Sequence, residues 1–109
     1  MKRLLHMLLL GTAITAVAAP DFHKDVAPIL REYCAGCHND DELEGEFSVE
    51  TFKSLMTGGD SGKVIAPGNT KDSLLLELLT GAKKPFMPPR KEPQPSPAQI
   101  ATLQAWVTA

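Results

Sequence analysis

Apolar positions recur at intervals of three and four residues in several parts of this chain, which is the spacing of an amphipathic helix. In residues 21–33 they fall on Phe22, Val26, Ile29, Leu30 and Tyr33. Pro28 is harmless if the regular helix starts near Asp25, because the first N–H groups of a helix have no partner within it; otherwise the proline kinks the helix. The pattern predicts an N-terminal helix over residues 21–33.

A short helix is predicted over residues 48–56, with Ser48 as its N-cap and the glycine-rich run that follows as its stop. Its inward-facing residues are expected to be Phe52, Leu55 and Met56. The run at residues 58–65 does not match a phosphate-binding loop, because Thr57 and Val64 stand where that pattern requires glycine and a hydroxyl residue. We interpret it as a turn whose glycines let the backbone approach a bound group closely.

A third helix is predicted over residues 72–79, capped by Asp72 or Ser73 and ended by Gly81. It is apolar nearly all round, so it should be buried.

The last helix covers residues 96–107. Ser96 is its N-cap, Pro97 takes the first helical position and Gln99 completes a capping box. Its apolar stripe consists of Ile100, Leu103, Trp106 and Val107. We expect this stripe to pack across the N-terminal helix.

The first 18 residues have a different composition from the rest. Lys2 and Arg3 precede an apolar run, and Ala16-Val17-Ala18 fits the small-x-small pattern of a cleavage site. We interpret residues 1–18 as a signal peptide and residues 19–109 as one domain. An uncleaved anchor is the alternative, but the apolar run is short for a membrane span. The mature domain is expected to be exported, to a periplasm or its equivalent, without a stable membrane anchor.

Composition narrows the choice of partners. Removing residues 1–18 takes Lys2 and Arg3 from the 11 basic residues and leaves 13 acidic ones, a formal charge of −4. This balance gives no support to nucleic-acid binding. Aromatic content is only 6% in a chain of 109 residues, so a bound apolar group would add mass that the small core lacks.

The strongest chemical signal is Cys34-Ala35-Gly36-Cys37-His38, the C-x-x-C-H pattern of covalent c-type haem attachment. Two thiols at this spacing can form thioethers with the two vinyl groups of one porphyrin, and His38 then becomes an axial ligand of the iron. Two alternatives remain: a disulfide or redox-active dithiol, and another metal, for which His23 is the other available histidine. A redox-active dithiol of the thioredoxin type expects a βαβ pattern, and none is visible in this sequence. A structural zinc site prefers four Cys or His ligands.

Met87 is the candidate for the second axial ligand. It lies in a proline-rich loop, residues 82–95, that can present a thioether at low entropic cost. Met56 is the competing methionine of the mature chain, and a haem without a methionine ligand is the remaining alternative.

Taken together, these segments resemble the class I cytochrome c fold, and more closely the small planctomycete-type cytochrome c domain. The resemblance rests on residues 22–30, the haem motif, residues 45–51, Pro67-Gly68 with Ser73-Leu74, Met87-Pro88-Pro89 and Trp106-Val107. It implies an all-α fold of about four short helices around one covalently bound haem c.

The predicted function is electron transfer by a chain that is not itself an enzyme, with donor and acceptor proteins as redox partners. His38 and Met87 would close both axial positions, which suits a carrier. The alternative is a haem-based enzyme or gas sensor with a displaceable sixth ligand. Four basic residues near Met87 can form a docking rim for an acidic partner, or can serve solubility alone: Lys83, Lys84, Arg90 and Lys91.

Overall fold

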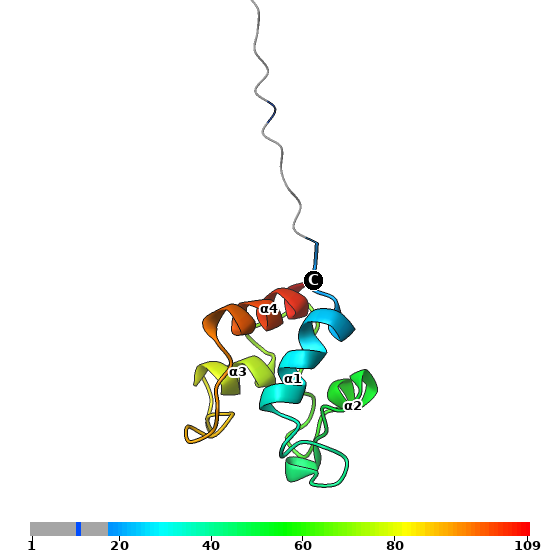
Figure 1. The fold of residues 1–109 in the computed structure, drawn as a ribbon, viewed down its shortest axis with the longest axis vertical. Coiled ribbons are helices and arrows are strands. Elements are labelled where there is room, and N and C mark those ends of the chain that lie inside the picture. Colours follow the sequence, from blue (N-terminus) through cyan, green and yellow to red (C-terminus); the bar gives the residue numbers. More distant parts are fainter. Residues whose placement is uncertain (1–10, 12–17) are drawn as a thin grey trace, which may run out of the picture.

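The computed structural model describes Gly11 and residues 18–109, and in this part of the chain the architecture is helical (Figure 1). Its only β-type pairing there is an isolated bridge between Gly59 and Gly62. The predicted all-α class with about four short helices is confirmed. Apart from Gly11 and Ala18, the predicted signal peptide lies outside the described residues. No helix among those residues is long and apolar enough to span a membrane.

The N-terminal helical segment has two parts. A π-helical turn, η1 (Phe22–Val26), leads into α1 (Ala27–Tyr33). Asp21 caps the segment, because its carboxylate accepts the N–H of Lys24 at 2.7 Å. Pro28 lies in the first turn of α1, directly after the π-helical turn. The regular helix therefore begins at Ala27, two residues later than Asp25.

The last helix, α4 (Pro97–Thr108), follows its prediction closely. Ser96 accepts the Gln99 N–H at 3.1 Å, and the Gln99 side chain accepts the Ser96 N–H at 2.8 Å. Leu103 and Val107 are buried, while Trp106 is half-buried with its ring 5.5 Å from that of Phe22. Helix α4 contacts η1, so the expected packing of the last helix on the N-terminal segment is confirmed.

The prediction for the second helix was wrong at its start. Helix α2 is Phe52–Thr57, and Thr51 is its N-cap, in a reciprocal capping box with Ser54. Ser48 is buried instead. The next residue, Val49, is also buried and donates its N–H to the His38 carbonyl at 2.8 Å. This bond holds the chain beside the haem motif, and the helix therefore starts later in the sequence than predicted.

The inward face predicted for this helix is only partly correct. Leu55 is fully buried and Met56 is half-buried, but Phe52 is 48% exposed. The Phe52 ring lies at the edge of an aromatic group, 5.2 Å from Phe22 and 6.4 Å from Trp106. Its position at the first turn of a helix that starts late leaves one ring face in solvent.

Helix α3 (Leu74–Thr80) begins after Ser73 and ends at Gly81, as predicted. The Ser73 hydroxyl is fully buried and bonds to the preceding loop rather than to the helix: it accepts the Ala66 N–H at 2.9 Å and donates to the Asn69 carbonyl at 2.7 Å. Only Leu76 and Leu79 of this helix are buried, and the rest are half-buried or exposed, so burial is less complete than predicted. Helix α3 contacts α4.

The core draws on η1, on the four α-helices and on the loops between them, whereas the short 3-10 helix η2 (Glu44–Glu46) contributes no buried residue. Its buried residues are Val26, Ile29, Leu30, Val49, Leu55, Val64, Ile65, Leu76, Leu79, Leu103 and Val107. Figure 1 shows α4 lying over the N-terminal end of the α1 segment, while the end of α1 points into the loops that follow it. The core thus fixes the direction in which Cys34 and the residues after it leave α1.

Candidate functional site

The two cysteines and His38 lie on one irregular turn at the end of α1. Cys34 caps the helix and donates its N–H to the Leu30 carbonyl at 2.9 Å. The Cys34 carbonyl then accepts the N–H groups of Cys37 at 3.3 Å and His38 at 3.0 Å. Both thiols are free; that of Cys34 is half-buried and that of Cys37 is exposed. The three predicted haem-attachment residues are therefore held together by local backbone bonds.

The His38 ring is held by one hydrogen bond and one aromatic contact. Its Nδ1 lies 2.8 Å from the backbone carbonyl oxygen of Glu44, and its ring centroid lies 5.2 Å from that of Phe47. A carbonyl oxygen only accepts, so Nδ1 carries the proton and donates. The lone pair of Nε2 is then available to a metal, which is the arrangement that orients histidine ligands in metal sites.

Asn39 organises the loop after the haem motif, a role that the sequence reasoning missed. Its side-chain nitrogen donates to the Ala35 carbonyl at 2.7 Å, and its side-chain oxygen accepts the N–H groups of Asp41 at 3.0 Å and Glu42 at 2.7 Å. The preference of asparagine for such local turns was the signal available in the sequence. These bonds turn the chain back toward His38.

The surroundings raise the pKa of both thiols, for different reasons. At Cys37 the largest cause is the negative charge of Glu44, followed by burial and the charge of Glu92. At Cys34 burial alone raises the pKa to about 11. Glu92 belongs to the same proline-rich segment as Met87. The structure therefore brings the far end of that segment within electrostatic range of Cys37.

Met87 is half-buried and its N–H donates to the Leu78 carbonyl of α3 at 3.1 Å. The segment that follows is tied by Gln94, whose side-chain nitrogen lies 2.9 Å from the Pro88 carbonyl, 3.0 Å from that of Pro89 and 3.1 Å from that of Glu92. The sequence pattern indicated that the prolines stiffen this loop but gave no sign of the role of Gln94, because its partners are backbone carbonyls and the residue itself is exposed.

The glycine run after α2 makes close approaches to protein backbone. A Cβ at Gly58 would collide with the Gly62 carbonyl, and a Cβ at Gly59 would collide with the Gly45 carbonyl. These contacts alone require glycine at both positions. The expected approach of this run to a haem stays a prediction.

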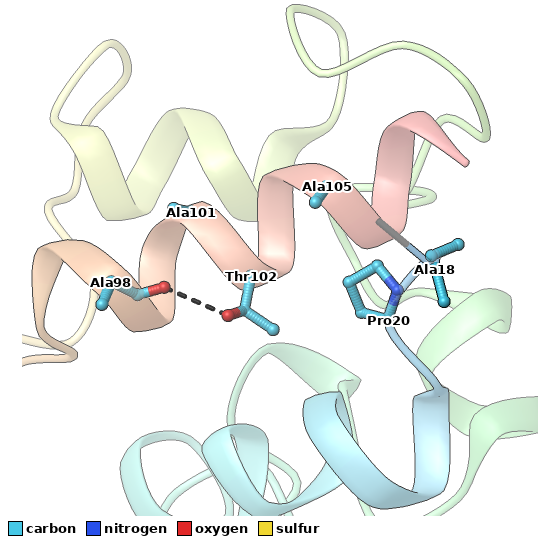
Figure 2. A pocket seen from close by; sticks show the side chains of 7 residues that line it. Ala18, Pro20, Ala98, Ala101, Thr102 and Ala105 are labelled. Carbon is cyan, nitrogen blue, oxygen red and sulfur yellow. Dashed lines mark hydrogen bonds between the residues drawn. The ribbon is translucent and has the colours of Figure 1, made fainter. Parts of the chain in front are cut away.

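Two hollows on the surface of the described residues lie elsewhere. One, shown in Figure 2, is an open groove between the N-terminal segment and α4, lined by Ala18, Ala19, Pro20, Ala98, Ala101, Thr102 and Ala105. Another is lined by Thr70, Lys71, Leu76, Glu77, Thr80, Ala82 and Gln104. Neither contains Cys34, Cys37, His38 or Met87. The candidate site is therefore identified by its donor groups and not by a cavity.

The residues at this site fit a covalently attached haem. Two free thiols stand one turn apart beside an imidazole whose Nε2 is available, and apolar side chains flank them while only partly buried, among them Tyr33 and Phe47. Exposed apolar surface beside the attachment point suits an apolar macrocycle. Within the described part of the chain, no three His, Cys, Asp or Glu side chains gather as a metal site, so the zinc alternative gains no support.

The chain was compared with known protein families, curated proteins and solved structures. The family described as planctomycete cytochrome C matches residues 34–91, more than half of the 109 residues. No curated protein and no solved structure matched. The matched range begins at Cys34 and contains Cys37, His38 and Met87. With its helical fold and its C-x-x-C-H turn, this chain belongs to the planctomycete cytochrome c family.

Proposed function

We propose that this chain is an exported monohaem c-type cytochrome that carries electrons between proteins. The observation that carries the proposal is the His38 turn, in which Nδ1 is engaged by the Glu44 carbonyl at 2.8 Å beside two free thiols. When bound, haem c supplies one iron that gains and loses a single electron. Cys34 and Cys37 would hold it through thioethers, and His38 would bind the iron through Nε2.

Met87 would be the second axial ligand. Its backbone is anchored to α3 through Leu78, and Gln94 ties the segment that follows it. A thioether on a restrained loop stays in place when the iron changes oxidation state, so little rearrangement accompanies electron transfer. A thioether ligand also raises the reduction potential. A haem enzyme or a gas sensor would instead need an open or displaceable sixth position.

The redox partner is proposed to present an acidic surface. Lys84, Arg90 and Lys91 are exposed on the segment around Met87, while Lys83 forms an ion pair with Glu77 at 3.4 Å. The Arg90 guanidinium lies over the Phe86 ring, 4.6 Å from its centroid, which restrains it beside Met87. In contrast, the loop after His38 carries exposed carboxylates, among them Asp41 and Glu42. An acidic partner would therefore be guided to the Met87 side.

Replacement of Met87 tests the proposed ligation. In the haem-loaded protein, Met87→Ala should open the sixth position, so that carbon monoxide binds the reduced form rapidly and the midpoint potential falls. Met56→Ala is the matched control, because Met56 is also a half-buried methionine but lies on α2. Stopped-flow mixing with carbon monoxide and a potentiometric titration measure both effects.

Met87→Ala could instead show the same carbon monoxide binding and the same midpoint potential as the unmodified protein. That result would contradict Met87 as an axial ligand. Rapid carbon monoxide binding by the unmodified protein would contradict the carrier and favour the sensor or enzyme alternative.

A further inference from the structure

The segment that reaches the His38 ring has an unusual backbone. Leu43 has φ 40° and Glu46 has φ 54°, both in the left-handed region that non-glycine residues rarely adopt. Between them lie Glu44, whose carbonyl accepts from His38 Nδ1, and Gly45 with φ 66°. Such a conformation persists only where neighbouring structure holds it. The residues that contact this segment therefore determine whether Glu44 stays in reach of His38.

The turn after α2 makes the contacts that hold this segment. Asp60 donates its N–H to the Gly45 carbonyl at 2.8 Å. Gly59 lies against the same carbonyl and against Phe47, so closely that an added Cβ would collide with the Gly45 oxygen and come within 2.9 Å of the Phe47 Cβ. Gly59 therefore touches the residue after Glu44 and the residue whose ring packs on His38.

The turn itself is closed by its own backbone hydrogen bonds. Gly59 and Gly62 exchange two backbone hydrogen bonds, with N···O distances of 3.1 and 2.9 Å. Gly58 closes the turn with φ 81°, and a Cβ there would collide with the Gly62 carbonyl. A segment closed in this way resists displacement and can serve as a fixed support for the loop packed on it.

We propose that the Gly58–Gly62 turn positions the His38 ligand, with Gly59 as the positioning residue, by holding the Glu44 carbonyl and the Phe47 ring against the imidazole. The proposal rests on the role of His38 as an axial ligand under the proposed function. A hydrogen bond to Nδ1 makes the imidazole a stronger donor to iron, which favours the oxidised state. The turn thereby helps to set the reduction potential, although none of its residues binds the iron.

The test is Gly59→Ala in the haem-loaded protein. The added methyl group must push the Gly45 and Phe47 segment away, which lengthens the Nδ1–H···O bond. The loss of a hydrogen bond of ordinary strength predicts about tenfold faster exchange of the His38 Nδ1 proton with D2O, followed by NMR of the oxidised protein. The midpoint potential should rise, because the imidazole becomes a weaker donor.

Gly68→Ala is the matched control. Gly68 has φ 76°, so a side chain there strains the backbone and lowers stability, but a Cβ at this position meets nothing within 4 Å. Its N–H donates to the carbonyl of Val107 in α4 at 2.7 Å. This variant should lose stability while its Nδ1 exchange and its potential stay as in the unmodified protein. A merely structural role for Gly59 would make the two variants behave alike.

A second measurement uses the unmodified protein, so it tests the positioning role even if Gly59→Ala fails to fold or to take up haem. In the unmodified haem-loaded protein, exchange of the Asp60 amide and of the His38 Nδ1 proton should show the same dependence on low denaturant concentrations, because one opening event exposes both. Different dependences, or unchanged exchange in Gly59→Ala, would overturn the positioning role. A His38 resonance without the shift caused by a bound paramagnetic iron would instead contradict His38 ligation itself.

Discussion

Gln94 ties the chain around Met87 together at the scale of single residues. The side-chain nitrogen of Gln94 lies within 3.1 Å of three carbonyl oxygens, those of Pro88, Pro89 and Glu92, so its two N–H donors are shared among three acceptors. Proline restricts its own φ but cannot donate a hydrogen bond, so the prolines alone cannot close this loop. The stability of the proposed Met87 ligation should therefore depend on the donor group of Gln94.

Gln94→Glu keeps the shape of the side chain and removes its donors. We expect the reduced haem-loaded variant to bind carbon monoxide at a measurable rate, unlike the unmodified protein, because a loosened loop releases the thioether more often. Stopped-flow mixing measures the rate. The control is Gln104→Glu, since Gln104 is exposed on α4. Equal rates in the two variants would show that Gln94 does not restrain the ligand loop.

The residues of the site differ in how far the sequence could predict them. Cys34, Cys37 and His38 follow from a contiguous motif whose spacing is itself the chemical requirement. The acceptor for the His38 ring could not be predicted, because a backbone carbonyl carries no residue signature and Glu44 reaches the ring only through left-handed residues on either side. Asn39 and Gln94 were missed because their partners are also backbone carbonyls and N–H groups.

At the scale of elements, local capping signals were reliable only where no long-range bond competed. Helix α4 starts where its capping box indicates, since Ser96 and Gln99 satisfy each other. The start of α2 was misplaced because Val49 bonds to the His38 carbonyl, a partner 11 positions earlier in the chain. Tertiary pairing overrode an acceptable serine cap at position 48 in favour of Thr51.

Ser96→Ala should destabilise the haem-loaded protein by about 1 kcal/mol, because the Gln99 N–H loses its acceptor at the start of α4. Guanidinium unfolding followed by circular dichroism should show a lower midpoint with an unchanged slope. Thr108→Ala, at the exposed opposite end of the same helix, should shift the midpoint much less. Equal shifts in both variants would contradict the capping role.

At the scale of the molecule, two helical segments distant in sequence pack together, and their aromatic contact was predictable only in outline. Phe22 and Trp106 stood at inward positions of their patterns, but the exposed position of Phe52 beside them depends on where α2 begins. The charge distribution was easier to predict. Acidic residues follow His38 and basic residues surround Met87 along the chain, and both groups are exposed.

The proposed acidic partner predicts a local charge effect on the rate of electron transfer. Lys84→Glu should slow oxidation of the reduced protein by the ferricyanide anion about threefold or more at low salt, and the difference should vanish at high salt. Lys24→Glu changes the net charge equally but lies in η1, at the other end of the helical segment from Cys34. Equal slowing in both variants would mean that only net charge matters, and it would contradict a docking rim around Met87.

The measurement that tests the central claim most directly is an absorption spectrum of the protein matured in a periplasm with haem-attachment machinery, oxidised and reduced, with and without carbon monoxide. We expect a low-spin spectrum that carbon monoxide leaves unchanged, and haem that stays with the protein through acid–acetone extraction. Haem that is extracted, or is absent, would contradict covalent attachment at Cys34 and Cys37. A spectrum that changes rapidly with carbon monoxide would contradict an iron closed by His38 and Met87.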